Sequence, residues 1–385
     1  MDIDLILKAA LDLEASDIHI KAGAPPQFRV QGQLTTIPQL PRLSAGDTEA
    51  LADQVMNDVW RRKLRQDLDI DLSYSLPGFG RFRGSIFYQR GTLAMTLRTI
   101  PFEVKSIRDL NLPVVLEKIC AFERGLVLVT GTTGSGKSTT LASMVDHINT
   151  TTRRNIITIE DPIEFLHRDK KSTIYQREVG WDVSTFARGL RSALREDPDI
   201  ILVGEMRDAE TMETALMAAE TGHLVLSTLH TTDATESINR IIGAFTPHQQ
   251  RQIRTQLSSI FKASVSMRLI PRAEAKGLVP AVEVMIVTPY VQECIRDRDK
   301  GGAIHDAIAA GVSEYGMQTF DQSVYHLFKK GLISLDQGIR HSSSPDNFKL
   351  RVQGVQSTAD IALEEMEKAI DRNGHLPPQG DPKTR

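Results

Sequence analysis

One glycine-rich segment of the chain has residue types and a spacing suited to holding phosphates. It reads GTTGSGKST and fits the pattern G-x-x-x-x-G-K-S/T. Its three glycines let backbone N–H groups converge on phosphate oxygens, where a Cβ atom would obstruct them. Lys137 can reach the β- and γ-phosphates, and the Ser138 hydroxyl can bind Mg²⁺. We therefore expect a nucleoside triphosphate to be bound by Gly131, Thr132, Thr133, Gly134, Ser135, Gly136, Lys137, Ser138 and Thr139.

A second segment, DPDIILVGEMRD, supplies a carboxylate for chemistry on that phosphate. Four apolar residues lead to Gly204 and Glu205, which places Glu205 at the carboxyl end of a buried strand. In a parallel sheet the phosphate loop lies at the same edge. A carboxylate there can orient and deprotonate the attacking water. Without the phosphate loop, Glu205 would be interpreted as a solvated residue just past a strand.

Acids also cluster in IEDPIEFLH, at Glu160, Asp161 and Glu164. Acids near a triphosphate repel it unless a metal or a positive side chain intervenes, so the cluster indicates Mg²⁺ or water binding. We predict Glu160 and Ser138 as metal-binding residues. The alternative is a charged turn at Asp161-Pro162.

Two histidines lie at the two ends of a further predicted strand in GHLVLSTLHTTDA. They are His223 and His230. A histidine at a strand end is more often a hydrogen-bonded structural residue than a catalyst. From these residues alone, a catalytic role is the less favoured of the two interpretations.

A predicted helix in STFARGLRSALRED carries arginines on one side. Arg188, Arg191 and Arg195 recur at helical spacing opposite an apolar face, and Ser184 is the expected N-cap. The stripe is either a solvated face or a surface for a subunit or an acidic partner. The expected buried face consists of Phe186, Leu190, Ala193 and Leu194.

Composition narrows the possible classes of protein. The 385 residues are 41% hydrophobic and 25% charged, with a net charge of −3, which disfavours an electrostatically driven nucleic-acid binder. The two cysteines, Cys120 and Cys294, disfavour a disulfide framework or a four-thiolate zinc site. There is no signal-peptide pattern and no apolar run long enough for a transmembrane segment. We expect a cytoplasmic protein that reaches a membrane only through a partner.

The pattern of elements predicts two domains. Residues 1–100 alternate β-formers with two helical segments, one in DIDLILKAALDL and one in AGDTEALADQVMNDVWRRKLR, as in an α+β domain. A linker follows at 101–113. Residues 114–345 alternate buried strands such as GLVLVTG with helices, which is typical of a doubly wound α/β core with C-terminal helices. Residues 346–385 are expected to form a polar, mobile tail.

These motifs in this order resemble the secretion-superfamily ATPases that drive type IV pili and type II secretion. GTTGSGKSTT is similar to the family's Walker A motif, DPDIILVGEMRD to its atypical Walker B motif, ITIEDPIEF to its aspartate box and GHLVLSTLHTTDA to its histidine box. The resemblance runs from ASDIH near residue 15 to about residue 340. SEYGMQTFDQSVYHLFKKGLIS resembles the retraction enzymes within the family, whereas AIAAG at 307–311 lacks the arginine of their AIRAG-like motif.

The resemblance implies a RecA-like P-loop NTPase core with a smaller PAS-like N-terminal domain. It implies a homohexameric ATPase that uses ATP and Mg²⁺ between these domains, powers pilus retraction and twitching motility, and acts on an inner-membrane pilus platform protein and, through it, on pilin. By motif match, the implied catalytic residues are Glu205 and Glu164, together with His230 and His223. Arginines of the N-terminal domain are implied to approach the phosphates, and the candidates are Arg81, Arg83 and Arg98.

Three rival functions stay open at this point. An assembly or accessory motor of the same superfamily is one, although a short N-terminal half and no tetracysteine insertion disfavour assembly. A RecA-like nucleic-acid motor is another, but only 5% of the residues are aromatic and we expect no direct nucleic-acid contact. The third is a nucleotide-dependent switch with negligible turnover.

Overall fold

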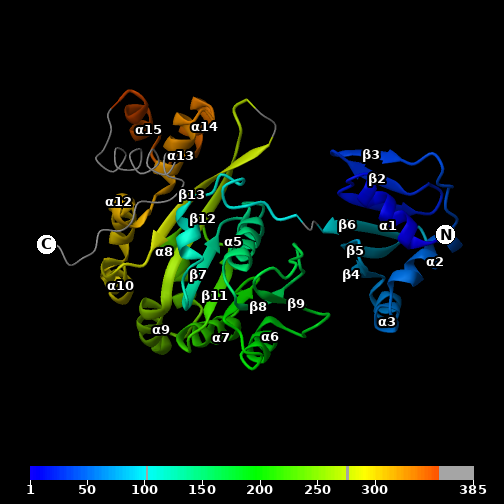
Figure 1. The fold of residues 1–385 in the computed structure, drawn as a ribbon, viewed down its shortest axis with the longest axis horizontal. Helices are drawn as coiled ribbons and strands as arrows, with labels where there is room; N and C mark the ends of the chain where they lie inside the picture. Colours follow the sequence, from blue (N-terminus) through cyan, green and yellow to red (C-terminus); the bar gives the residue numbers. More distant parts are fainter. Residues whose placement is uncertain (101–102, 275–276, 355–385) are drawn as a thin grey trace. The chain divides into compact units, whose positions relative to one another are not determined.

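The computed structural model describes residues 1–100, 103–274 and 277–354, which divide into two compact units (Figure 1). The N-terminal unit comprises Met1–Glu103 together with Pro162–His167. The C-terminal unit comprises the rest of the described chain. The segment around Glu164 therefore belongs to a different unit from the strands that flank it in sequence.

The N-terminal unit is built on an antiparallel sheet, with helices packed against it. Its strand order is β3-β2-β1-β6-β5-β4. Ile6 of α1 and Leu51 of α2 share one hydrophobic cluster with Phe28 and Phe82 of the sheet, so the apolar faces of helices and strands close a single core. The elements are α1 (Ile3–Asp12), β1 (Asp17–Lys21), β2 (Gln27–Val30), β3 (Gln33–Thr36), α2 (Ala45–Val55), α3 (Asp58–Asp67), β4 (Asp69–Leu76), β5 (Gly80–Gln89) and β6 (Thr92–Ile100).

The prediction of a single helix in AGDTEALADQVMNDVWRRKLR is wrong, because the segment forms two helices, α2 and α3. Met56 is extended after α2, and the Asn57 side chain accepts hydrogen bonds from the backbone N–H groups of Val59 and Trp60. An asparagine that satisfies the first free N–H groups of a helix starts a new one. The interruption is therefore encoded by Asn57.

The C-terminal unit contains a largely parallel sheet in the order β13-β12-β7-β11-β10-β8-β9. Along the interior strand β7, Leu126 and Leu128 join one hydrophobic cluster while Val127 and Val129 join another. Helices therefore cover both faces, which explains why this strand is apolar at successive positions. The strands are β7 (Gly125–Thr130), β8 (Asn155–Glu160), β9 (Thr173–Glu178), β10 (Ile200–Val203), β11 (Leu224–Leu229), β12 (Phe261–Pro271) and β13 (Leu278–Ile286).

The helices of the C-terminal unit alternate with these strands and then form a C-terminal group (Figure 1). In that group, Phe320 and Val324 pack on Ile270 and Val279 of the β12–β13 pair. The helices are α4 (Val115–Ile119), α5 (Lys137–Thr151), α6 (Phe186–Ala193), α7 (Ala209–Glu220), α8 (Ala234–Gly243), α9 (Pro247–Ile260), α10 (Pro289–Arg296), the 3₁₀ helix η1 (Arg298–Ala303), α11 (Ile304–Ala310), α12 (Val312–Tyr315), α13 (Phe320–Lys329), α14 (Leu335–His341) and α15 (Pro345–Val352).

Two segments expected to be polar connections pack partly into the core. Ile107 and Leu112, within the predicted linker 101–113, are buried in the cluster that covers one face of the sheet. The expected tail needs correction over its first residues, because α15 buries Phe348 against α13. A few apolar side chains in otherwise polar sequence therefore anchor both the predicted linker and the start of the predicted tail. Residues 355–385, including the helical candidate STADIALEEMEKAIDR, lie outside the described residues.

Candidate active site

The phosphate loop, Gly131–Thr139, turns from β7 into α5 with backbone torsions that favour glycine. The φ angles are 141° at Gly131, 77° at Gly134 and 95° at Gly136. A Cβ atom on Gly131 would lie 2.5 Å from Ser135 Oγ and 2.6 Å from the Met267 carbonyl oxygen. The loop is therefore packed tightly against β12, and Gly131 has no room for a side chain.

The polar groups of this loop fit the phosphates of a nucleotide. Helix α5 starts after Gly136, and no described side chain caps its first N–H groups. Lys137 Nζ donates to the carbonyl oxygens of Gly131 and Thr132, both at 2.9 Å, so its ammonium lies over the loop. Ser135 Oγ is buried without a hydrogen-bond partner in the described chain. Uncapped helix N–H groups and an ammonium are the donors that phosphate-binding loops use.

The parallel strands bring three predicted chemical groups to one edge of the sheet. Strand β7 leads into the phosphate loop, β11 ends next to His230, and β10 ends just before Glu205. In the register, Leu229 pairs with Thr130, and Val203 pairs with Ser227. Because the carboxyl ends of adjacent parallel strands meet, these groups lie along one edge in the order phosphate loop, His230, Glu205.

Glu205 is held as a nearly buried carboxylate between two nitrogen-bearing side chains. Arg207 Nε lies 2.7 Å from Oε1, and His230 Nε2 lies 3.5 Å from Oε2. The Glu205 side chain is 12% exposed. The preceding Gly204 is fixed by its N–H to the Ile159 carbonyl (2.8 Å) and by the Thr228 hydroxyl to its own carbonyl (2.6 Å). A rigid carboxylate at this edge has the chemistry to accept a proton from water.

His223 lies at the opposite edge of the sheet, so the structure does not bring it to Glu205. Its carbonyl accepts from Gly125 N–H at the start of β7, and its Nδ1 lies 3.0 Å from the Ala218 carbonyl oxygen at the end of α7. The length of β11, about 20 Å at roughly 3.3 Å per residue, separates it from His230. The two histidines of GHLVLSTLHTTDA thus have different surroundings, and the contacts of His223 are with the end of α7 and the start of β7.

Comparison with known proteins decides the family. The model of the family "Type II/IV secretion system protein" matches residues 1–304. The chain is 45% identical over 348 residues to the type IV pilus retraction ATPase PilT of Pseudomonas aeruginosa, covering 90% of this chain and 100% of that relative. It is 44% identical over 326 residues to the twitching motility protein of Neisseria gonorrhoeae, covering 85% and 86%. The chain belongs to the type II/IV secretion system protein family.

A solved structure extends this likeness to three dimensions. The crystal structure of the pilus retraction motor PilT with bound ADP has a TM-score of 0.83 and 46% identity, and covers 91% of this chain and 99% of that chain. The predicted α/β fold with an N-terminal domain and an ATPase core is confirmed, and so is the predicted class of enzyme, an ATPase. Within the described residues, no helix combines the length and apolar character that a membrane crossing needs.

In this family member, the predicted metal residues are not adjacent. Glu160 ends β8, three strands from β7, which corresponds to about 14 Å at roughly 4.8 Å per strand. Its Oε1 accepts from Thr158 Oγ1 at 2.6 Å and Gln176 Nε2 at 3.2 Å. No group of three or more His, Cys, Asp or Glu side chains in the described chain could hold a metal. Mg²⁺ usually keeps several waters and binds substrate phosphates, and half-buried Ser138 is the predicted metal residue that lies in the phosphate loop.

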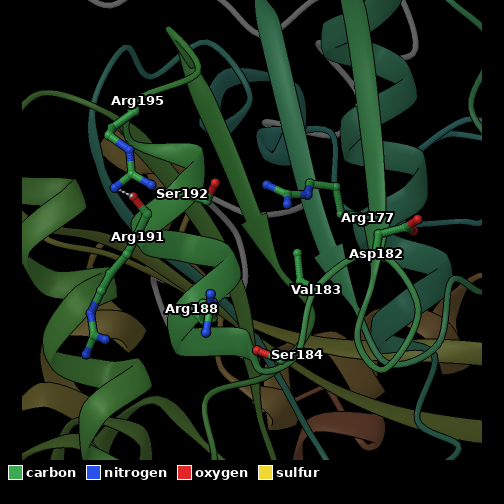
Figure 2. A pocket seen from close by; sticks show the side chains of 8 residues that line it. All are labelled: Arg177, Asp182, Val183, Ser184, Arg188, Arg191, Ser192 and Arg195. Carbon is green, nitrogen blue, oxygen red and sulfur yellow. Dashed lines mark hydrogen bonds between the residues drawn. The ribbon is translucent and has the colours of Figure 1, made fainter.

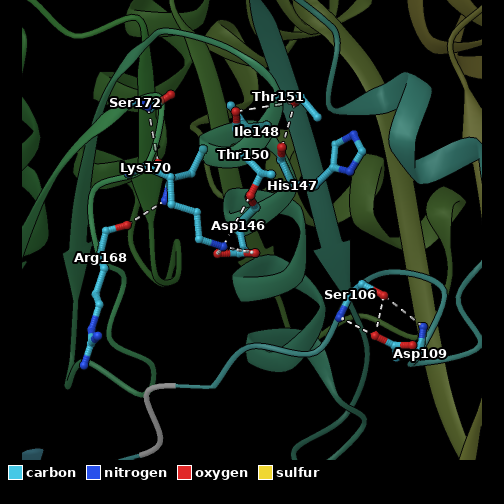
Figure 3. Close-up of polar contacts among 11 residues, drawn as sticks. Ser106, Asp109, Asp146, His147, Ile148, Thr150, Thr151, Arg168, Lys170 and Ser172 are labelled. Carbon is cyan, nitrogen blue, oxygen red and sulfur yellow. Dashed lines mark hydrogen bonds and ion pairs between the residues drawn. The ribbon is translucent and has the colours of Figure 1, made fainter.

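The segment that carries Glu164 leaves the C-terminal unit after Asp161 and returns at Arg168. Its return is fastened to α5 through the fully buried Asn149, whose Nδ2 donates to the Arg168 carbonyl (2.8 Å) and whose Oδ1 accepts from Lys170 N–H (3.1 Å). Lys170 Nζ also pairs with Asp146 at 2.7 Å (Figure 3). Helix α5 thus carries the phosphate loop at one end and this anchor near the other.

The three predicted arginines lie on two adjacent strands of the N-terminal unit. Arg83 on β5 is directly opposite Arg98 on β6. Arg98 Nε pairs with Asp17 at 2.9 Å. Burial acts to raise the pKa of Asp17, but hydrogen bonds from Arg98 and Ser16 outweigh it and lower that pKa. Arg81 Nη1 donates to Ser75 Oγ at 3.3 Å, whereas exposed Arg83 has no ion pair within the described residues.

The arginine stripe of α6 lines an open hollow of about 690 Å³ with Arg177 of β9 (Figure 2). Arg191 pairs with Glu210 and Arg177 with Glu196, so acids of the same unit already neutralise two of the cations. The helix starts one residue later than expected, because its N-cap is Thr185, whose side chain accepts from Arg188 N–H. Leu190 and Ala193 are buried as predicted, while Phe186 and Leu194 are half-buried.

Sequence reasoning missed Arg207 and Asn149. Arg207 stands two residues after Glu205 in DPDIILVGEMRD, so its nearness to the carboxylate was readable from the motif. Asn149 gave no signal, because only the folded return of Arg168–Ser172 shows that its amide closes a network.

Proposed function

We propose that the chain is an ATP-hydrolysing motor that powers type IV pilus retraction. Its alignment with the full length of a relative named as a pilus retraction ATPase supports this function. The single observation that carries the proposal is the shared edge at which the phosphate loop, His230 and Glu205 meet in a chain so similar to PilT. Retraction would disassemble the pilus and produce twitching motility.

In the proposed reaction, the P-loop N–H groups and Lys137 bind the phosphates of ATP. Bound Mg²⁺, held through Ser138, would neutralise developing negative charge on the phosphoryl group. Glu205 orients a water and accepts its proton. Arg207 and His230 hold the Glu205 carboxylate in place, and both stay accessible, with 71% and 51% of their side chains exposed.

The remaining predicted residues keep defined roles in this proposal. Glu160, kept in position by Thr158, acts on the metal only through water. Glu164 couples hydrolysis to movement of the N-terminal unit, since its segment belongs to that unit while both flanks belong to the other. Among the arginines, Arg83 is the first candidate to neutralise transition-state charge, because Arg98 is already paired with Asp17.

The proposed assembly is a homohexamer on the cytoplasmic side of the inner membrane. There it would act on a pilus platform protein and, through it, on pilin. Mass photometry of the purified chain with ATP analogue and Mg²⁺ tests the assembly. A species of about six chains is expected, and a sample that stays monomeric under all nucleotide conditions contradicts a ring motor.

A deletion strain tests the direction of the work. Complementation with the wild-type gene should restore twitching, whereas Lys137→Ala should leave cells hyperpiliated and immobile, because pili form but are not withdrawn. Bald cells would instead indicate an assembly motor. Normal twitching with the Lys137→Ala chain would show that another ATPase supplies retraction and that this chain is at most accessory to it.

A further inference from the structure

A buried carboxylate outside the proposed reaction centre lies under the segment that carries His230. Glu283 stands in the middle of β13 and is 4% exposed. One of its oxygens, Oε1, accepts from the backbone N–H of Ala234 at 2.9 Å and lies 3.4 Å from Ser266 Oγ of β12. A carboxylate is costly to bury unless it forms specific hydrogen bonds, so its placement calls for a reason.

Ala234 is the first residue of α8, only four residues after His230. The Asp233 side chain caps the same helix by accepting from Glu236 N–H at 2.8 Å. Glu283 therefore supplies a second acceptor at this helix start, and it reaches there from a strand of the sheet rather than from the local chain. The interaction ties the beginning of α8 to β13.

The short connection between His230 and α8 has little freedom of its own. Thr231 Oγ1 and Ser237 Oγ lie 2.6 Å apart and are buried, and the Thr232 N–H and hydroxyl both donate to Glu236. This connection is internally rigid, so a displacement of the helix start would displace His230 with it. The contact between Glu283 and Ala234 fixes the connection relative to the sheet on which Glu205 sits.

We propose that Glu283 is a positioning residue that places His230 against Glu205 by holding the start of α8. The inference rests on the proposed role of His230 in hydrolysis. The other charged groups that face Glu283 are Asp233 at the start of α8, Arg268 of β12 and His305 of α11, which line a hollow of about 180 Å³ beside it. They set the charge around the carboxylate, whereas the hydrogen bond from Ala234 N–H ties it to the segment that carries His230.

A double-mutant cycle at pH 8 tests this role. Glu283→Gln keeps an acceptor but loses the charge, and Glu283→Met fills the space without an acceptor. We expect kcat to fall about threefold and about tenfold respectively, the latter being about 1.4 kcal/mol of barrier, with ATP affinity unchanged. In a His230→Ala background, both substitutions should have no further effect on kcat, since the group through which Glu283 acts is gone.

Gln322 provides a matched control on α13. It is 2% exposed and its Oε1 likewise accepts from a backbone N–H at a helix start, that of Thr319, at 2.9 Å. Gln322→Met should lower the Tm, leave kcat unchanged, and be additive with His230→Ala. Glu283→Gln should instead raise the Tm at pH 8, because it removes a carboxylate that is costly to bury. It should lower kcat, and its effect should not add to that of His230→Ala. Equal, additive losses for Glu283 and Gln322 variants would overturn the proposal.

Hydrogen–deuterium exchange of the nucleotide-free chain gives a readout that is independent of turnover. Faster exchange at residues 231–238 in Glu283→Gln, with no change in the same peptide of Gln322→Met, supports the proposed hold on α8. Unchanged exchange overturns it, and this result decides the matter if Glu283→Met does not fold. If His230→Ala hydrolyses ATP at the wild-type rate, the proposed role of His230 fails instead, and exchange alone then tests the link to α8.

Discussion

The two edges of the C-terminal sheet hold similar residue types in different environments. At the amino edge, His223 bonds the end of α7, and Asp199 accepts from Asn155 N–H at 2.8 Å and pairs with Arg154 at 3.3 Å. These side chains fasten strands and helices to each other. At the carboxyl edge, Glu205 and His230 face one another beside a loop with an uncapped helix start.

The difference arises from how helices begin at the carboxyl edge. Helices α7 and α8 both start there, and each is capped by an aspartate: Asp208 accepts from Thr211 N–H and Asp233 from Glu236 N–H, both at 2.8 Å. Helix α5 starts at the same edge after Gly136 without a side-chain cap. Among these three described helices, the one that follows the phosphate loop is therefore the one whose first N–H groups are left to an external anion. Residues of the same type therefore have a structural role at the amino end of a strand and can take part in chemistry at its carboxyl end.

The substitution expected to have the largest effect at the carboxyl edge is Glu205→Gln. Removing the proposed base should lower kcat by about 10³-fold, within the range that general acid–base catalysis contributes, and leave ATP binding intact. Steady-state hydrolysis and binding of a fluorescent ATP analogue measure the two effects. Asp199→Asn at the amino edge is the matched control and should keep kcat. Turnover that survives Glu205→Gln would argue against Glu205 as the base.

A direct comparison of the two edges uses the histidines at the ends of β11. His230→Ala should lower kcat about tenfold, or about 1.4 kcal/mol of barrier, because it removes the imidazole that lies 3.5 Å from Glu205 and holds that carboxylate in the proposed reaction. His223→Ala should leave kcat unchanged and lower the free energy of unfolding by about 1 kcal/mol, since it loses a hydrogen bond to the end of α7. Kinetics and urea unfolding of both variants measure this. Equal loss of activity in the two would mean that the edges are not functionally distinct.

The sequence alone was sufficient for the groups whose position follows from a strand end. Glu205 and the phosphate loop each follow an apolar run, and parallel strands align such ends without further information. The same rule could have separated the histidines, because His223 precedes its strand and His230 follows it. The motif resemblance grouped them, and only the register of β11 against β7 shows the separation.

Contacts between distant segments could not be predicted in this way. The sequence of β12 does not predict a buried strand, because Lys262, Ser264 and Ser266 interrupt its apolar pattern, although both serines are buried against β7 and β13. The roles of Asn149 and Glu283 depend on that same long-range packing. From sequence alone, a polar residue within a strand or helix is predicted to be exposed, because its hydrogen-bond partner is not known. The separation of the predicted metal residues has a related cause, since Glu160 and Ser138 share an edge but not neighbouring strands, and their roles stay a prediction.

The smallest expected effect at the carboxyl edge is a change in how stability depends on pH in Glu283→Gln. Burial raises the pKa of Glu283, partly opposed by the hydrogen bond from Ala234. The folded chain therefore keeps a proton that the unfolded chain releases, so wild-type stability falls as pH rises from the ordinary glutamate pKa through the raised one. Glutamine has no proton to lose, so the variant should gain stability relative to wild type across that window and stay level above it. Urea unfolding from pH 4 to 8 measures the difference, and Gln322→Met should show no such slope. A constant offset between Glu283→Gln and wild type at every pH would mean that the carboxylate titrates alike in the folded and unfolded chains.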